Sequence, residues 1–497
     1  MAVNNDHDPR DFESLDPEDW EAARATAHEM IDDVVDFLKS VRERPAWRRM
    51  PEASRDIINE PIPRRGTELG EVYATFREHI LPFPTGNIHP GFYGWVKGTG
   101  SLTGALAEFL SGTMNANIAG FDQSPTVVEK QVLNWLAELV DYPRDCSGLL
   151  VSGGTVANLN GLAVARTECA GFDVRKEGIT QSATRLTVYG STETHSWIYK
   201  ACDLMGLGLD AFRKVQVHDD FTIDVQACRQ RIEQDIATGM KPFCIVANVG
   251  TVNSAAIDDV TALRQLSDDF GLWLHVDGAF GSLAAWSEET RGLVAAQASA
   301  DSIAFDLHKW GYMPYDIGCV LTRNPAAQLN TFRHGASYLS PTDRGVAVDS
   351  TYFNDRGIQL SRSFRALKAW MCMKEQGVDK IGRMISKNVR QAQYLGNLVQ
   401  AHEKLELVAP VSLNISCLRY IHDSLSKESL NALNEEILLR IQEQGLAVPS
   451  NTVLNGRFAI RVCITNHRTT TSDLKALAEA VVAHGDDILN EEDLLPS

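Results

Sequence analysis

The chain has 497 residues, 44% of them hydrophobic, which is enough for a large domain with smaller flanking domains. Its 47 basic and 65 acidic residues give a formal net charge of −18, which repels polyanions and disfavours nucleic acid or an anionic membrane as the main partner. The nine cysteines contain no C-x-x-C pair, the N-terminus is acidic, and no apolar run approaches the roughly 20 residues that span a bilayer. We therefore expect reduced thiols, no metal site and a cytoplasmic location.

The first predicted element is an amphipathic helix that follows Pro17. Apolar residues recur at helical spacing from Ala27 to Leu38, and Pro45 ends the pattern. Prolines at positions 61, 63, 82 and 84 then place the end of an N-terminal helical segment near residue 85. One long apolar stripe with little to cover it is expected to pack on a second subunit, so the segment 1–85 predicts a homodimer.

Residues 86–375 alternate short apolar runs with helical sequence, which is typical of a parallel α/β sheet. The predicted strands are 149–151, 185–189, 243–247, 272–276 and 302–305. Residues 376–497 predict a small α+β domain, with helices over 430–444 and 472–488 and a strand over 458–462.

Ligands of open α/β sheets bind at the carboxyl ends of the strands, so the residues that follow these runs are candidates for a site. Ser152-Gly153-Gly154-Thr155 follows the first run and opens a helix. Its backbone N–H groups, the helix N-terminus and the Thr155 hydroxyl would suit a phosphate. By itself, such a turn is usually structural.

Three later strands are followed by residues that suit an aldehyde cofactor with a pyridine ring. Asp277 could pair with a protonated ring nitrogen, although an isolated aspartate is usually a turn or cap residue. Lys309, at the end of the next run, would lose its charge by desolvation, and the depressed pKa would suit imine formation. His195 could stack on one ring face while Ala279 packs on the other, or it could be a half-buried structural histidine. The coincidence of these signals on successive strands favours a cofactor site.

With these residues in place, the sequence resembles the group II pyridoxal-phosphate-dependent amino-acid decarboxylases, which include aromatic-amino-acid, glutamate and cysteine-sulfinate enzymes. The resemblance covers nearly the whole chain. It is carried by His89-Pro90-Gly91-Phe92, Ser152 to Asn158, Thr194-His195-Ser196, His275 to Ala279, His308-Lys309-Trp310 and Leu360 to Lys368.

The resemblance implies the aspartate-aminotransferase fold (fold type I), with a mostly parallel seven-stranded sheet, and a homodimer whose active site lies between subunits. It implies decarboxylation of an L-amino acid with pyridoxal 5′-phosphate (PLP). Lys309 would hold the cofactor as a Schiff base, Asp277 would face the ring nitrogen, and His195 would stack on the ring. Gly154, Thr155, His308 and Thr251 would also contact the cofactor. Tyr338 would protonate the carbanion left by CO₂.

The substrate is less defined by this resemblance. Trp95, Asn117, Arg362 and Arg461 are the candidate substrate residues. The stretches 94–98 and 115–121 lack most of the aromatic lining of the aromatic-substrate enzymes, and the Asn-x-Asn pattern is closer to the glutamate-type branch. Trp95 could equally flank an aromatic substrate, and Lys97 could pair with a substrate carboxylate. Asp306-Leu307 replaces the usual Asn-Pro or Asp-Pro, and Gly250-Thr251-Val252 replaces Gly-Thr-Thr.

Two alternatives stay open. An aldehyde synthase or a carbon–carbon lyase would use the same cofactor for different chemistry, although the presence of Tyr338 favours simple decarboxylation. A non-catalytic protein of the same fold is disfavoured because Lys309, Asp277 and His195 are all present.

Overall fold

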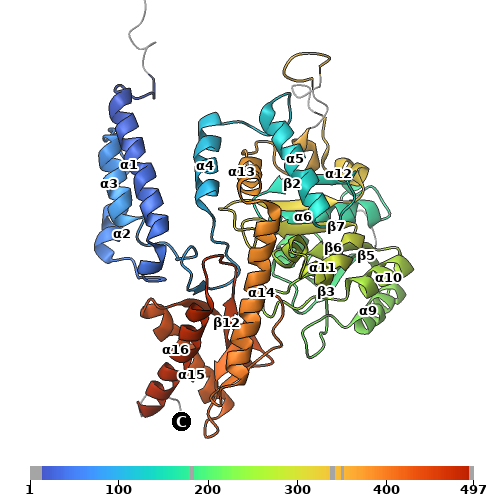
Figure 1. Ribbon diagram of the computed structural model, residues 1–497. Helices are drawn as coiled ribbons and strands as arrows, with labels where there is room; N and C mark the ends of the chain where they lie inside the picture. Colours follow the sequence, from blue (N-terminus) through green and yellow to red (C-terminus); the bar gives the residue numbers. More distant parts are fainter. Residues whose placement is uncertain (1–13, 180–183, 336–341, 349–351, 492–497) are drawn as a thin grey trace, which may run out of the picture. The chain divides into compact units, whose positions relative to one another are not determined.

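The computed structural model describes residues 14–179, 184–335, 342–348 and 352–491 (Figure 1). The chain divides into two compact units. The first contains the described part of residues 1–44 together with 48–85, and the second contains 45–47 and the described part of 86–497.

The N-terminal unit is helical. It contains α1 (Trp20–Lys39), α2 (Glu52–Ile58) and α3 (Leu69–His79). The side chain of Asp19 caps α1 by accepting hydrogen bonds from the first-turn backbone, so the predicted amphipathic helix is confirmed. The Tyr73 hydroxyl donates to Asp33 at 2.8 Å and ties α3 to α1. Several large apolar side chains of this unit are exposed in the single chain, namely Trp20, Ile31, Val35, Val72 and Phe76.

The large sheet of the second unit has seven strands in the order β2-β8-β7-β6-β5-β3-β4. These strands are β2 (Ser147–Val151), β3 (Leu186–Ser191), β4 (Phe212–Val215), β5 (Lys241–Asn248), β6 (Trp273–Asp277), β7 (Ser302–Asp306) and β8 (Gly318–Thr322). All pairings are parallel except those of β8, which runs antiparallel to both neighbours. The predicted mostly parallel sheet is confirmed; β4 and β8 were not predicted.

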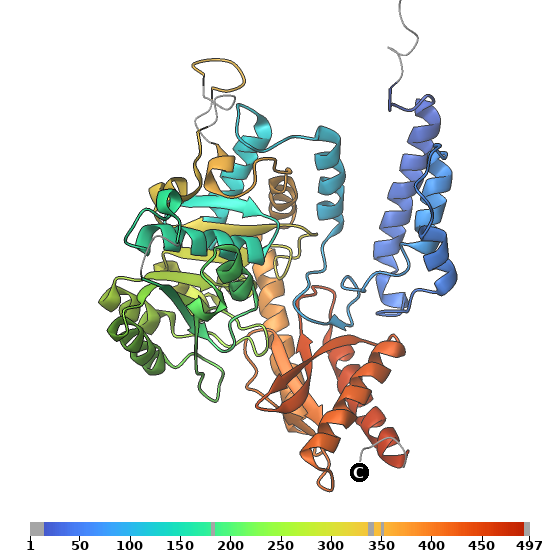
Figure 2. The ribbon, with the colours of Figure 1, turned by 180° about the vertical axis from the view of Figure 1, so that it is seen from behind.

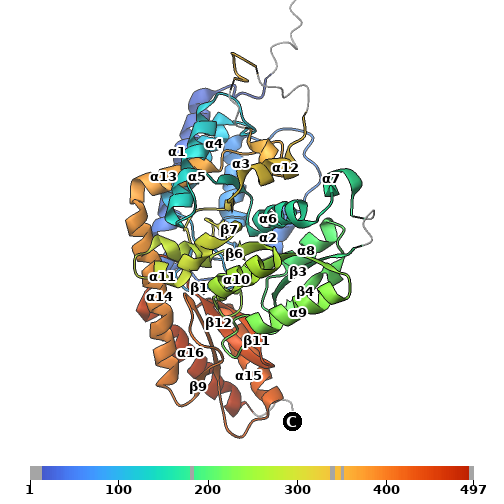
Figure 3. The same ribbon diagram turned by 90° about the vertical axis from the view of Figure 1, so that its right-hand side faces the viewer.

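Helices cover the strands of this sheet, and most strand residues are buried. Helix α6 (Gly154–Cys169) packs along β5, β6, β7 and β8, whereas α9 (Val225–Ala237) and α10 (Val260–Phe270) pack on strands β3 to β6 (Figure 3). The remaining helices of this region are α4 (Leu102–Met114), α5 (Ser124–Leu139), α7 (Val174–Glu177), α8 (Trp197–Leu204), α11 (Arg291–Val294), α12 (Pro325–Phe332) and α13 (Ala366–Gln376). Coverage by helices explains why the strands read as continuous apolar runs.

A second sheet has the strand order β1-β11-β12-β10-β9, and its four C-terminal strands are orange to red in Figure 2. Its strands are β1 (Phe92–Tyr93), β9 (Leu405–Leu407), β10 (Ile415–Tyr420), β11 (Val448–Leu454) and β12 (Arg457–Cys463). Helices α14 (Val378–Gln400), α15 (Lys427–Glu443) and α16 (Thr471–Asn490) pack on it. The α+β character is confirmed, and the separation at residue 375 stays a proposal.

Two whole-chain features bear on the expectations from composition. All nine cysteines are free, and seven are buried. Within the described residues, no helix combines the length and apolarity needed to cross a membrane.

Candidate active site

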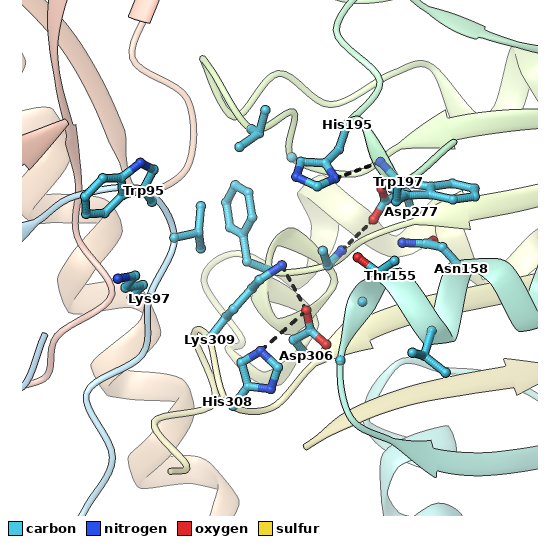
Figure 4. Close-up of a pocket in the computed structure, with 18 of the residues that line it drawn as sticks. Trp95, Lys97, Thr155, Asn158, His195, Trp197, Asp277, Asp306, His308 and Lys309 are labelled. Carbon is cyan, nitrogen blue, oxygen red and sulfur yellow. Dashed lines mark hydrogen bonds and ion pairs between the residues drawn. The ribbon is translucent and has the colours of Figure 1, made fainter. Parts of the chain in front are cut away.

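The candidate site is a cavity of about 520 Å³ at the carboxyl ends of the central strands. Thr155 from the start of α6, His195 after β3, Asp277 at the end of β6 and Lys309 after β7 all line it (Figure 4). Strand topology thus brings four candidates into one cavity, although they lie far apart in the sequence.

Lys309 faces an acidic partner in the same turn. Its Nζ lies 2.8 Å from Oδ2 of Asp306, whose side chain is only 1% exposed. Burial alone would lower the pKa of Lys309, but the charge of Asp306 and its hydrogen bond outweigh burial and raise the pKa above the ordinary value. The expectation of a depressed lysine pKa is therefore wrong for the chain by itself, because Asp306 stabilises the ammonium form.

His308 lies beside the same carboxylate. Its Nδ1 accepts a hydrogen bond from the backbone N–H of Ile317 at 3.1 Å, which leaves Nε2 facing Asp306 at 3.8 Å. Burial lowers the pKa of His308, so the ring is neutral near pH 7 and carries its proton on Nε2. The Tyr315 ring packs on it with centroids 4.3 Å apart.

Asp277 is held in a fixed orientation at the end of β6. The indole Nε1 of Trp197 donates to Oδ2 at 2.6 Å, and the backbone N–H of Ala279 donates to Oδ1 at 3.1 Å. Both bonds fix the direction of the carboxyl group, which could pair with a cationic ring nitrogen.

His195 lines the cavity beside Asp277 (Figure 4). Its Nδ1 accepts from the backbone N–H of Trp197 at 3.3 Å. Burial lowers the pKa of His195, and the attraction of Asp277 opposes only part of that effect. A neutral imidazole is flat and lightly solvated, so it can stack on an aromatic ring.

The turn before α6 has room for backbone only. A Cβ on Gly154 would lie 2.8 Å from Oδ2 of Asp306, and one on Gly153 would lie 3.0 Å from Cε1 of His308. The two glycines therefore let the N-terminus of a 16-residue helix open directly into the cavity.

These residues fit PLP. The Gly153-Gly154 turn and Thr155 offer donors for its phosphate, and Asp277 offers an acceptor for its ring nitrogen. Lys309 lines the same cavity, with its ammonium group beside Asp306. Among the described residues, no group of three or more His, Cys, Asp or Glu side chains is arranged to hold a metal ion.

Thr251 and Asn117 lie outside the cavity lining. The Thr251 hydroxyl is engaged in its own turn, where it accepts from the backbone N–H of Ala256 at 3.0 Å and pairs with Ser254. The Asn117 side chain accepts from the backbone N–H of Arg362 at 3.0 Å. In the chain by itself, the neighbours Gly250 and Val252 line the cavity in place of Thr251.

The two candidate arginines bind protein groups. Buried Arg362 pairs with Glu129 and donates to the backbone oxygens of Ile118 and Leu150. Arg461 donates to the backbone oxygen of Trp95 at 2.7 Å, to that of Asn253 at 3.1 Å, and to that of Val252. Neither lines the cavity in the single chain, where both hold the loops around it, and their assignment as substrate residues stays a prediction.

Trp95 lines the mouth of the cavity, with 53% of its surface exposed. Its backbone has a φ of 52°, a left-handed conformation that is unfavourable for a bulky residue. The bond from Arg461 to its carbonyl and the bond from its N–H to Ser450 at 3.1 Å hold that conformation. Nζ of Lys97 lies 4.7 Å from the Trp95 ring centroid.

Several residues that line the cavity were not predicted to do so, namely Asn158, Trp197, Phe280, Asp306 and Tyr315. Trp197 directly follows the quoted Thr-His-Ser segment, and Asn158 is the last residue of the quoted segment from Ser152, so both lie at the ends of motifs that the sequence already marks. Tyr338 lies outside the described residues.

The chain is similar to known proteins over nearly all of its length. A family model described as "Pyridoxal-dependent decarboxylase conserved domain" matches residues 51–421. An aromatic-L-amino-acid decarboxylase of Bacillus atrophaeus is 32% identical over 474 residues, which cover 93% of this chain and 96% of that protein.

Solved structures show the same fold. The Oryza sativa protein TDC, solved with PLP and tryptamine, superposes with a TM-score of 0.88 at 25% identity, covering 96% of this chain and 100% of that chain. The 4-hydroxyphenylacetaldehyde synthase of Rhodiola rosea superposes with a TM-score of 0.84 at 23% identity, covering 95% of this chain and 100% of that chain, so its likeness concerns the fold alone.

Proposed function

The chain belongs to the pyridoxal-dependent decarboxylase family, and on that premise we propose that its substrate is an aromatic L-amino acid. It is a PLP-dependent carboxy-lyase that converts an amino acid to an amine and CO₂. The residues at the mouth of the cavity and the similar proteins support this substrate class.

The observation that carries this proposal is the set of apolar side chains beside the lysine. Trp95, Val96, Val252 and Phe280 line the cavity together with Lys309. Aromatic side chains bury much apolar area and gain further from ring–ring contact, which Trp95 can supply. The aromatic-L-amino-acid decarboxylase of Bacillus atrophaeus supports the same class.

A second candidate is an amino acid with an acidic side chain, because Lys97 also lines the mouth. Burial lowers the pKa of Lys97 because it disfavours the ammonium form, and an anionic ligand would stabilise that form. The ammonium group of Lys97 lies over the Trp95 ring, and that contact already stabilises the cation. This favours an aromatic substrate over an acidic one.

Each site residue has a proposed role. PLP, when bound, draws electrons from the bond between Cα and the carboxylate of the amino acid. Lys309 binds the cofactor and releases it to the substrate. While Lys309 is free of the cofactor, the carboxylate of Asp306 pairs with its ammonium group. Asp277 keeps the ring nitrogen protonated, and His195 stacks on the ring face and excludes water.

We assign the proton transfer to Cα to Tyr338, on the strength of the family resemblance. Replacing it by phenylalanine removes an acid, which costs about 10²- to 10⁴-fold in amine formation. The fraction of aldehyde among the products should rise. Amine, aldehyde and hydrogen peroxide are measured together by chromatography and a peroxidase assay. Stoichiometric aldehyde and peroxide from the unaltered protein would instead establish an aldehyde synthase.

A homodimer is also proposed. It is supported by the apolar side chains that the N-terminal unit leaves exposed in the single chain, such as Val72 and Phe76. A cytoplasmic location, supported by the nine free thiols, completes the proposal.

The deciding experiment is a substrate panel. The PLP-loaded protein is incubated with tyrosine, tryptophan, phenylalanine, glutamate, aspartate and cysteine sulfinate, and CO₂ release is measured for each. We expect the aromatic amino acids to give the highest kcat/KM. A clear preference for glutamate, aspartate or cysteine sulfinate would overturn the aromatic assignment and favour the role of Lys97.

A further inference from the structure

A chain of hydrogen bonds between buried side chains lies behind the cavity and ends at Asn158. The indole Nε1 of Trp273 is 2.8 Å from Oγ of Ser302, and that Oγ is 2.7 Å from Nδ1 of His275. The His275 Nε2 is 2.7 Å from Oδ1 of Asn158. His275 and Ser302 are completely buried and Asn158 is 1% exposed.

Trp273, the first residue in this series of hydrogen bonds, fixes the direction of the bonds that follow. An indole N–H can only donate, so Ser302 accepts from Trp273. The Ser302 hydroxyl has His275 Nδ1 as its only acceptor among the described residues, so it donates there. Nδ1 is then an acceptor, and a neutral His275 carries its single proton on Nε2.

The neutral form of His275 is favoured by its surroundings. Burial lowers its pKa to about 4, and the attraction of Asp277 opposes only part of this shift. The proton on Nε2 is therefore donated to Asn158, whose amide must present its oxygen to His275. The opposite amide orientation would set two N–H donors against each other.

The consequence lies on the other side of the amide. With Oδ1 held by His275, the Nδ2 group is the part of Asn158 left for the cavity, which Asn158 lines beside Thr155 and Asp277 (Figure 4). Within the described part of the chain, no side chain or backbone oxygen accepts a hydrogen bond from it. A ligand that brings an acceptor atom into the cavity can therefore take a hydrogen bond from Nδ2.

We propose that Asn158 donates a hydrogen bond to the bound cofactor, and that Trp273, Ser302 and His275 are positioning residues that orient its amide. The proposal rests on the PLP site described above. It adds to that site a donor on the first turns of α6, in the same cavity as Thr155 and Asp277.

Helix α6 is shaped to admit the imidazole. Gly161 follows Asn158 by three residues, on the same face of the helix. A Cβ there would lie 2.5 Å from Cε1 and 2.6 Å from Nδ1 of His275. The glycine lets the ring lie against the helix within reach of both Ser302 and Asn158.

The test is a double-mutant cycle on cofactor affinity. Ser302→Ala and Asn158→Leu are made singly and together, and the dissociation constant of PLP is measured by titrating the cofactor-depleted protein and following tryptophan fluorescence. Asn158→Leu keeps the volume and loses the donor, so we expect affinity to fall about 3- to 10-fold. Ser302→Ala should weaken binding by a smaller factor, and should have no further effect in the Asn158→Leu background.

The controls separate positioning from simple packing. Ser302→Thr keeps the hydroxyl and should restore most of the affinity that Ser302→Ala loses. If Asn158→Leu binds PLP as the unaltered protein does, or if Ser302→Ala weakens binding equally in both backgrounds, the proposal is wrong. Failure of the cofactor site itself would look different, because the unaltered protein would then not bind PLP.

A second measurement does not depend on the Asn158 and Ser302 variants. In the unaltered protein labelled with ¹⁵N-histidine, long-range proton–nitrogen spectra distinguish protonated from unprotonated ring nitrogens, and a His275→Gln sample identifies the signals of His275. We expect the proton on Nε2. A proton on Nδ1 would reverse the bonds that His275 makes with Ser302 and with Asn158, and would overturn the inference.

Discussion

The cofactor end and the mouth of the cavity are built in different ways. At the cofactor end, Thr155, Asp277 and Lys309 each lie at the start of a helix or the end of a strand of one sheet. At the mouth, Trp95 follows the two-residue strand β1 and is held by Arg461 of β12, 366 residues away. Side chains at strand ends are placed by sheet topology, whereas the mouth depends on loops that distant elements hold in place.

The largest effect expected at the cofactor end comes from Lys309→Ala, which should abolish turnover and the adduct trapped by borohydride. This substitution leaves Asp306 as an unpaired buried carboxylate, so stability should also fall, by about 3–5 kcal/mol. Adding Asp306→Asn should restore stability but not activity. Turnover by Lys309→Ala at the unaltered rate would contradict the assignment, and Lys380→Ala, on the exposed side of α14, is the matched control.

The next effect separates support of the site from substrate binding. Arg362→Met should destabilise the protein by about 3–5 kcal/mol, because it leaves Glu129 buried and unpaired. Denaturant unfolding measures this loss, and Arg362→Met combined with Glu129→Gln should recover most of it. A stable Arg362→Met variant with a raised KM would instead restore the arginine as a substrate ligand.

Acid should weaken both ends through buried histidines. Burial lowers the pKa of His275, behind the cofactor end, and that of His467, near the mouth, to about 4 each. The unfolded chain binds these protons near pH 6.5, so the stabilisation is fully present above pH 6.5 and is lost as pH falls toward 4. Each histidine accounts for about 3 kcal/mol of the free energy of unfolding.

Denaturant unfolding at a series of pH values checks this. A His467→Asn variant should lose about 3 kcal/mol of the pH dependence of unfolding between pH 6.5 and 4. An unchanged slope in that variant would show that His467 is not buried as a neutral ring.

How much the sequence predicts follows the same division. The spacing of the apolar residues, the glycine turns and the strand-end residues predicted the mostly parallel sheet and the group around Asp277, because those signals are local. The antiparallel strand β8 and the pairing of Phe92 with Val448 depend on contacts between distant segments. The charge state of Lys309 was mispredicted for a related reason, because burial was counted without the opposing charge of Asp306.

The smallest effect tests the mouth directly. Trp95→Ala removes one aromatic wall, and loss of a ring–ring contact worth about 0.5–1.5 kcal/mol should raise KM for an aromatic substrate up to about tenfold, with kcat little changed. Steady-state kinetics with tyrosine and glutamate measure this, and Leu293→Ala, which is 57% exposed and outside the cavity lining, is the control. An unchanged KM for tyrosine would mean that the substrate does not reach Trp95. The mouth would then lie elsewhere, while the cofactor end would stand as described, because the two are held by separate sets of contacts.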